Sequence, residues 1–124
     1  VTVIIASGRG PEEWAESRHF ARSQIGFYGS TPTYRVLLEL HGFAEHADRL
    51  RALAAAGRWS ELADAIPEEM LHTFAVVAPP EEIAERLRER YRGIADRIVF
   101  YGLRPPRPLD DEAFWRETIR ALKD

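Results

Sequence analysis

The 124-residue chain contains no cysteine, which excludes disulfide bonds and thiolate chemistry. It also lacks any run of the ~18 apolar residues that a membrane-spanning helix needs, so we expect no membrane partner and a cytoplasmic address. Positive charge is not in excess, because the net charge is -3 and the arginines lie close to carboxylates in the sequence. A nucleic-acid partner is therefore not expected.

Spacings typical of metal or nucleophile sites are absent as well. The four histidines, His19, His41, His46 and His72, show no paired metal-ligand spacing, so we predict no metal site. Gly29-Ser30-Thr31 lacks the preceding strand of a nucleophile elbow. What the sequence does contain is hydrophobic residues at 45% and charged residues at 30%, which are ordinary values for one globular domain.

The stretch from Phe74 to Gly102 organises the sequence. A short apolar run ends at Ala78, and two prolines followed by two glutamates then predict a helix beginning at about Pro80. Its apolar stripe is Ile83, Leu87 and Tyr91, and Gly93 ends it. Residues 97–102 follow with four consecutive apolar or aromatic residues, typical of a strand buried on both faces.

The rest of the chain is predicted to be one strand and several helices. The strand covers 1–6, and the helices cover 11–28, 32–41, 44–57, 61–66, 67–74 and 111–122, with Ser60 as the cap of the helix over 61–66. Strands joined through helices should lie parallel, so we predict a mostly helical α/β fold with two parallel strands. Two strands leave too little sheet for so many helices, and the chain opens directly inside an apolar strand. We therefore expect the missing strands to come from upstream sequence or from another copy.

Two segments are candidates for ligand binding. Ser7-Gly8-Arg9-Gly10 joins a strand to a helix, as dinucleotide-binding loops do, but Glu13 stands where their third glycine is expected. A glycine-rich turn is the simpler interpretation. The segment Ile25–Arg35 concentrates hydroxyls, aromatic rings and a cation at a helix break, where they could face an anionic ligand. The alternative is helix capping by Ser30 or Thr31 together with aromatic packing.

Three phrases resemble a known family. They are Gln24–Arg35 (QIGFYGSTPTYR), Leu38–Phe43 (LELHGF) and Phe74–Leu87 (FAVVAPPEEIAERL). They resemble the C-terminal part of the luciferase-like monooxygenase superfamily, and within it the deazaflavin (coenzyme F-420)-dependent oxidoreductase branch.

This resemblance implies a (β/α)8 TIM barrel of which the chain is the C-terminal third. Residues 1–6 would be strand seven, 11–92 a helical insert, 97–102 strand eight and 111–122 the last helix. The implied cofactor is coenzyme F-420 or FMN at the C-terminal mouth of the barrel. Hydride would pass between the cofactor and a small organic substrate, or the reduced flavin would activate oxygen.

The resemblance also implies which residues of this chain reach the cofactor. They lie in loops at the mouth of the barrel: Ser7, Gly8, Arg9, Arg35, Tyr101 and Gly102. The residues that hold the ring, and any catalytic base, would lie in the N-terminal portion, so we expect the segment to be inactive alone. The alternative hypothesis is a non-enzymatic helical module that self-associates through its strand edges.

Overall fold

A computed structural model describes residues 1–101 and 112–124. The chain divides into two units, of which the first contains residues 1–18 and 75–124 and the second contains residues 19–74. Within the described ranges, no helix combines the length and the apolar character needed to cross a membrane.

The first unit is built on a parallel three-stranded sheet with the order β2-β1-β3. The strands are β1 (Thr2–Ala6), β2 (Ala75–Val77) and β3 (Val99–Tyr101). In the register of this sheet, Ile4 of β1 lies opposite Ala75 of β2 and opposite Tyr101 of β3. The central strand is therefore the first one in the sequence.

The parallel α/β fold is confirmed, but the prediction of two strands is wrong. The structure has a third strand, β2, within residues 11–92, which were predicted to be a helical insert. Three apolar residues are too few for periodicity to distinguish a buried strand from a buried helix end. Pairing with the free edge of β1 decides the conformation, because it satisfies backbone groups of both segments.

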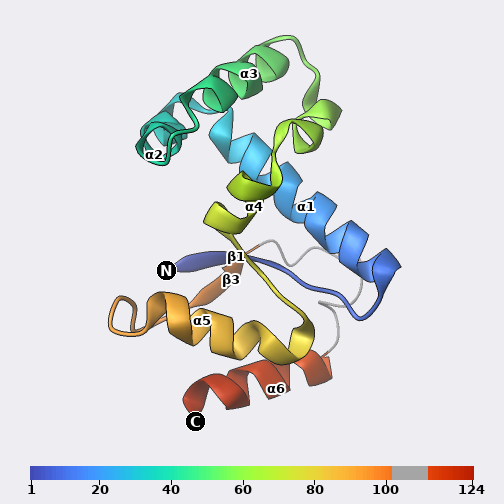
Figure 1. The fold of residues 1–124 in the computed structure, drawn as a ribbon, viewed down its shortest axis with the longest axis vertical. Coiled ribbons are helices and arrows are strands. Elements are labelled where there is room, and N and C mark those ends of the chain that lie inside the picture. Colours follow the sequence, from blue (N-terminus) through green and yellow to red (C-terminus); the bar gives the residue numbers. More distant parts are fainter. Residues whose placement is uncertain (102–111) are drawn as a thin grey trace. The chain divides into compact units, whose positions relative to one another are not determined.

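Two helices pack on this sheet, side by side (Figure 1). They are α5 (Ile83–Tyr91), preceded by the 3-10 turn η4 (Pro80–Glu82), and α6 (Glu112–Lys123). Alternate residues of β1 point to the same face, so Val3 and Ile5 join Leu87 and Phe114 in one buried cluster. The ring of Phe100 stacks on the ring of Trp115 with 4.5 Å between the centroids.

The second unit is helical. Its elements are the second half of α1 (Pro11–Gly29), η1 (Pro32–Tyr34), α2 (Arg35–Leu40), α3 (Ala44–Ala55), η2 (Trp59–Glu61), η3 (Ala63–Ala65) and α4 (Glu68–Phe74). The predicted helix over 11–28 is confirmed as α1. The predicted break at Pro67, which has no backbone N–H, is confirmed, and the helix predicted from Pro67 to Phe74 is α4. The helix predicted over 61–66 is instead replaced by the 3-10 turns η2 and η3.

Close approach to α1 fixes the core of the second unit. A Cβ atom added at Gly29 would lie 2.9 Å from Cδ1 of Leu50, and one added at Gly26 would lie 2.9 Å from Cβ of Leu62. Leu50 is fully buried, as are Met70 and Leu71. Glycine on this face of α1 lets the neighbouring segments pack directly against the helix backbone.

Candidate functional site

The loop that follows β1 carries a buried serine whose hydroxyl is unsatisfied. The backbone N–H of Ser7 donates to Oγ of Ser17 at 2.9 Å, which ties the end of β1 to α1. Ser7 is fully buried, and its own Oγ has no hydrogen-bond partner among the described residues. Because buried hydroxyls in proteins are normally paired, this oxygen lacks the partner that such a group usually has.

Gly8 is required by packing inside the protein. A Cβ atom at this position would lie 2.4 Å from the backbone nitrogen of Trp14, and a contact this short forces the backbone to move. The group that comes close to Gly8 is thus the first turn of α1. No dinucleotide is needed to explain this glycine.

The N-terminus of α1 already holds a carboxylate. The backbone N–H of Arg9 donates to Oε2 of Glu13 at 2.8 Å, and the N–H of Trp14 donates to the carbonyl of Gly10 at 2.9 Å. Glu12 adds a second negative charge in the first turn. The positive end of the helix dipole is thereby compensated by the chain itself, which disfavours a bound pyrophosphate.

A cavity of about 410 Å³ opens beside the loops that follow β1 and β2. Arg9 comes from the first loop and Glu81 from the second, while Phe114, Glu117 and Thr118 come from α6. Charges of both signs and an apolar floor suit a small polar molecule. The walls come from α5 and α6, so the cavity lies on the helix-covered side of the sheet.

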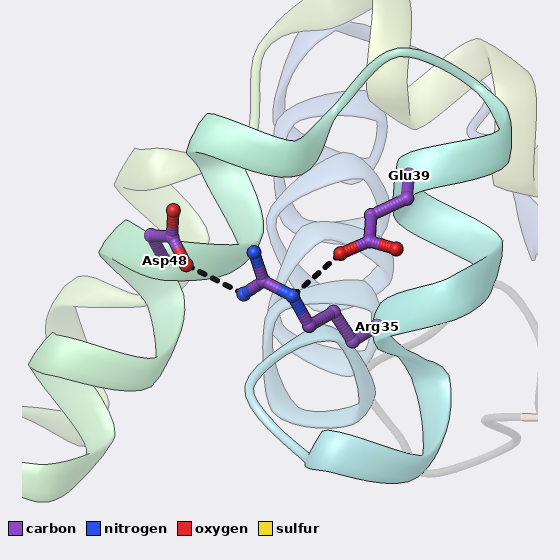
Figure 2. Close-up of polar contacts among 3 residues, drawn as sticks. All are labelled: Arg35, Glu39 and Asp48. Atoms are coloured by element: carbon purple, nitrogen blue, oxygen red, sulfur yellow. Dashed lines mark hydrogen bonds and ion pairs between the residues drawn. The ribbon is translucent and has the colours of Figure 1, made fainter.

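Arg35 lies in the second unit, where two carboxylates hold its guanidinium (Figure 2). Its Nε donates to Oε1 of Glu39 at 2.6 Å, and its Nη1 donates to Oδ1 of Asp48 at 2.5 Å. These hydrogen bonds, first the one to Asp48 and then the one to Glu39, raise the pKa of Arg35 above its ordinary value. The ion pairs link α2 to α3, and an anionic ligand would have to replace one carboxylate.

The hydroxyls of Ser30 and Thr31 form hydrogen bonds with carbonyls at the end of α1. Oγ of Ser30 donates to the carbonyl of Phe27 at 2.7 Å, and Oγ1 of Thr31 donates to the carbonyl of Tyr28 at 2.8 Å. Thr31 makes no side-chain cap at η1, so the predicted N-capping is wrong. These two side chains satisfy carbonyls at the preceding helix end instead.

Of the two remaining predicted residues, the structure describes only the backbone of Tyr101. Tyr101 is the last residue of β3, and the sheet register brings its backbone opposite Ile4, three positions before Ser7. Gly102 and the side chain of Tyr101 lie outside the described part of the chain. The sheet thus brings the carboxyl ends of β1 and β3 to one edge, while the roles of all six predicted residues stay predictions.

The roles of Ser17 and Glu13 were not predicted from the sequence. Oγ of Ser17 accepts a hydrogen bond from the N–H of Ser7, which lies ten positions earlier, and this separation is not a helical spacing. Glu13 was considered only because it stands where a dinucleotide-binding loop has its third glycine, and not as a hydrogen-bond acceptor. For the residues that the structure describes, no group of three or more His, Asp or Glu side chains is placed to hold a metal ion.

Comparison with known proteins identifies the family. The model of the luciferase-like monooxygenase family matches residues 1–97. Uncharacterised proteins of Mycobacterium bovis and of Mycobacterium tuberculosis are each 42% identical over 97 residues, which cover 78% of this chain and 28% of the relative. The 5,10-methylenetetrahydromethanopterin reductase of Archaeoglobus fulgidus is 27% identical over 130 residues, covering 98% of this chain and 38% of that protein.

No solved structure matches the chain significantly. The chain spans less than a third of the length of its mycobacterial relatives. The family match nevertheless extends from β1 through the whole second unit to the end of α5. The resemblance predicted from three short phrases is therefore confirmed, and the chain belongs to the luciferase-like monooxygenase family.

Proposed function

We propose that the chain is the C-terminal part of a deazaflavin- or flavin-dependent oxidoreductase. The whole protein would transfer hydride between the cofactor, coenzyme F-420 or FMN, and a small organic substrate. Family membership supports the oxidoreductase class. The similarity to a reductase that acts on a methylene-carrying pterin compound favours hydride transfer over oxygen activation.

The observation that carries this proposal is the buried, unsatisfied Oγ of Ser7 at the carboxyl end of β1. In parallel α/β sheets and barrels, ligands bind at the carboxyl ends of the strands. A hydroxyl at that edge, without a partner in the described residues, can donate to a cofactor oxygen or accept from a ring N–H.

The fit to the cofactor is partial. Ser7 offers a hydrogen bond, and Arg9 places a cation near the carboxyl edge. Arg35 is engaged by Glu39 and Asp48, so it offers no unbalanced charge. When bound, the cofactor supplies the hydride chemistry, and these residues would orient it. Because so few contacts are present, we propose that the residues that hold the ring belong to the rest of the parent protein and that this chain alone is inactive.

The strand pairing agrees in one respect with a barrel and differs in another. β1 and β3 pair directly, as strands seven and eight of a barrel would. β2 pairs with the other edge of β1, where strand six would lie. We infer that β2 leaves this edge when the upstream strands are present. The free energy lost when β2 unpairs is small, because the strand has only three residues.

The test is cofactor binding by two proteins, the 124-residue chain and the parent protein of which we propose it forms part. Coenzyme F-420 and FMN are each titrated by fluorescence quenching. We expect binding by the parent and none by the chain alone. In the parent, Ser7→Ala should weaken cofactor binding roughly 5- to 20-fold, the equivalent of one hydrogen bond. Ser60→Ala, at an exposed position, is the matched control.

Two results would contradict the proposal. Stoichiometric binding of either cofactor by the 124-residue chain would show that the main contacts are not elsewhere. If the parent binds neither coenzyme F-420 nor FMN, the oxidoreductase assignment is contradicted. The alternative module that pairs through strand edges would use the outer edges of β2 and β3, because both edges of β1 are occupied.

A further inference from the structure

The cavity of about 410 Å³ in the first unit is lined by a buried threonine whose hydroxyl has no partner in the described chain. Thr118 of α6 is only 4% exposed. Its hydroxyl forms no hydrogen bond with any other described residue, whereas Oγ1 of Thr73, also in a helix, donates to the carbonyl of Glu69 at 2.7 Å. Because buried hydroxyls are normally paired, the side chain of Thr118 is the first observation that points to a ligand in this cavity.

Two carboxylates on the walls of the cavity form no ion pair within the described ranges. Glu81 comes from η4 and Glu117 from α6. The helix dipole accounts for Glu81, which stands in a first turn, but not for Glu117, which stands in the middle of α6. Arg120 follows Glu117 at the spacing of a helical ion pair, yet the two side chains are not paired. Both carboxylates can therefore accept hydrogen bonds from a cation.

The charges that line the cavity favour a cationic ligand. Among the described residues of the lining, Arg9 is the one positive charge, and it stands against the carboxylates of Glu81 and Glu117. An anion would face two like charges on entering, whereas a cation would complement them. The sign of the ligand follows from this balance.

The rest of the lining is apolar and mostly small. Phe114 provides a ring, while Ala84 and Ala121 carry only a methyl group each and leave space between α5 and α6, which lie side by side (Figure 1). The volume of the cavity lies in the range of ~300–1,000 Å³ that is usual for small-molecule sites. A compact apolar group therefore fits beside the polar groups.

We propose that this cavity binds a small organic ammonium ion, in which a primary amine is attached to a compact apolar group. The three N–H donors of a primary ammonium match the carboxylates of Glu81 and Glu117 and the hydroxyl of Thr118. The apolar group packs against Phe114. This site goes beyond the cofactor assignment and does not depend on it, because that assignment rests on Ser7, which does not line the cavity.

The experiment is a titration of the 124-residue chain with benzylamine at neutral pH, followed by amide NMR spectra. Benzyl alcohol, which has the same shape without the charge, and benzoate, which has the opposite charge, are titrated in parallel. Glu117→Gln and Thr118→Val each change one polar group of the site, and Ala121→Leu fills the cavity. Glu45→Gln is the matched control, because Glu45 is an exposed carboxylate in α3 of the second unit.

Each variant is expected to fold. Thr118→Val removes a hydroxyl that has no partner in the described chain, so it should not lower the midpoint of urea unfolding. Glu117 is exposed and unpaired among the described residues, so Glu117→Gln should leave that midpoint nearly unchanged. Circular dichroism verifies the helix content of all variants before the titrations.

We expect benzylamine to shift the amide signals of residues 80–84 and 114–121 with a Kd of about 0.1–3 mM, as is usual for so small a ligand. Glu117→Gln and Thr118→Val should each weaken binding roughly 3- to 10-fold, and Ala121→Leu should abolish it. Glu45→Gln should change the Kd less than about 2-fold. Benzyl alcohol should bind at least ~5-fold more weakly than benzylamine, and benzoate more weakly still.

Three results would overturn the proposal. The first is the absence of shifts at these residues with benzylamine at about 20 mM, well above the expected Kd. The second is equal binding of benzylamine and benzyl alcohol, which would show that the carboxylates do not recognise the charge. The third is binding that Ala121→Leu leaves intact, which would place the amine outside the cavity.

Discussion

Replacing Ser7 by alanine should stabilise the chain. A buried hydroxyl loses its hydrogen bonds to water on folding and normally regains them inside the protein. Oγ of Ser7 regains none from the described residues, so its desolvation is uncompensated. Alanine keeps the Cβ atom and the backbone N–H, which still donates to Oγ of Ser17 at 2.9 Å. Only the unpaired oxygen is removed.

The magnitude follows from the cost of leaving a polar group unpaired, about 1–3 kcal/mol. Removing the oxygen atom leaves a small void, and the cost of this void offsets a small part of the stabilisation. We therefore expect Ser7→Ala to raise the free energy of unfolding by about 1–2 kcal/mol. For a chain of this length, that corresponds to an increase in Tm of about 3–8 °C.

Urea titration followed by circular dichroism measures the difference, because an unchanged m-value shows that the midpoint shift reports stability. Ser17→Ala is the informative partner. It leaves the buried N–H of Ser7 without its acceptor and should lower stability by about 1–2 kcal/mol. Two substitutions of the same residue type, ten positions apart, should therefore act in opposite directions. Destabilisation by Ser7→Ala of 1 kcal/mol or more would refute the claim that its hydroxyl is unpaired.

Three further predictions concern other contacts. Gly8→Ala should cost about 1–3 kcal/mol in a urea titration, because the added Cβ meets the backbone of α1; an unchanged midpoint would contradict this close packing. Arg90→Met should cost about 1 kcal/mol by losing the 2.9 Å hydrogen bond from Nη1 to the carbonyl of Ala75, and a neutral result would mean that this contact contributes nothing. The hydrogen bond from Arg58 lowers the pKa of Glu61, so this pair contributes stability above the unfolded-state pKa and loses it as pH falls through the lower folded-state value. In Arg58→Gln, the pKa of Glu61, measured by NMR titration of its carboxyl, should return toward its ordinary value.

The elements with long, regular signals could be predicted from the sequence. α1 has a proline and two glutamates at its start and eighteen residues of helical pattern, and α5 has a clear apolar stripe. β1 is a continuous apolar run. In each of these elements, local propensity, end signals and periodicity favour the same conformation, and tertiary packing did not change it.

β2 could not be predicted, because three residues carry no period and their state depends on a strand about 70 positions earlier. The hydrogen bond from Arg90 of α5 to the carbonyl of Ala75 also has no signal in the sequence, because it joins a helix to a strand 15 positions earlier. The contact between Ser7 and Ser17 also has no sequence signal, since a loop and a helix meet there at a spacing set by packing. The candidate site could be placed at the strand ends, but its hydrogen bonds could not.

The central position of β1 has a consequence for the chain during synthesis. Its partners β2 and β3 follow about 70 and 95 residues later, with the whole helical unit between them. At a translation rate of ~5–20 residues per second, β1 waits for several seconds before β2 or β3 is made. The helices of residues 19–74 have mostly local contacts and can form in that interval. Of the three described strands, the one that waits longest for its partners in this chain is therefore the one at the centre of the sheet.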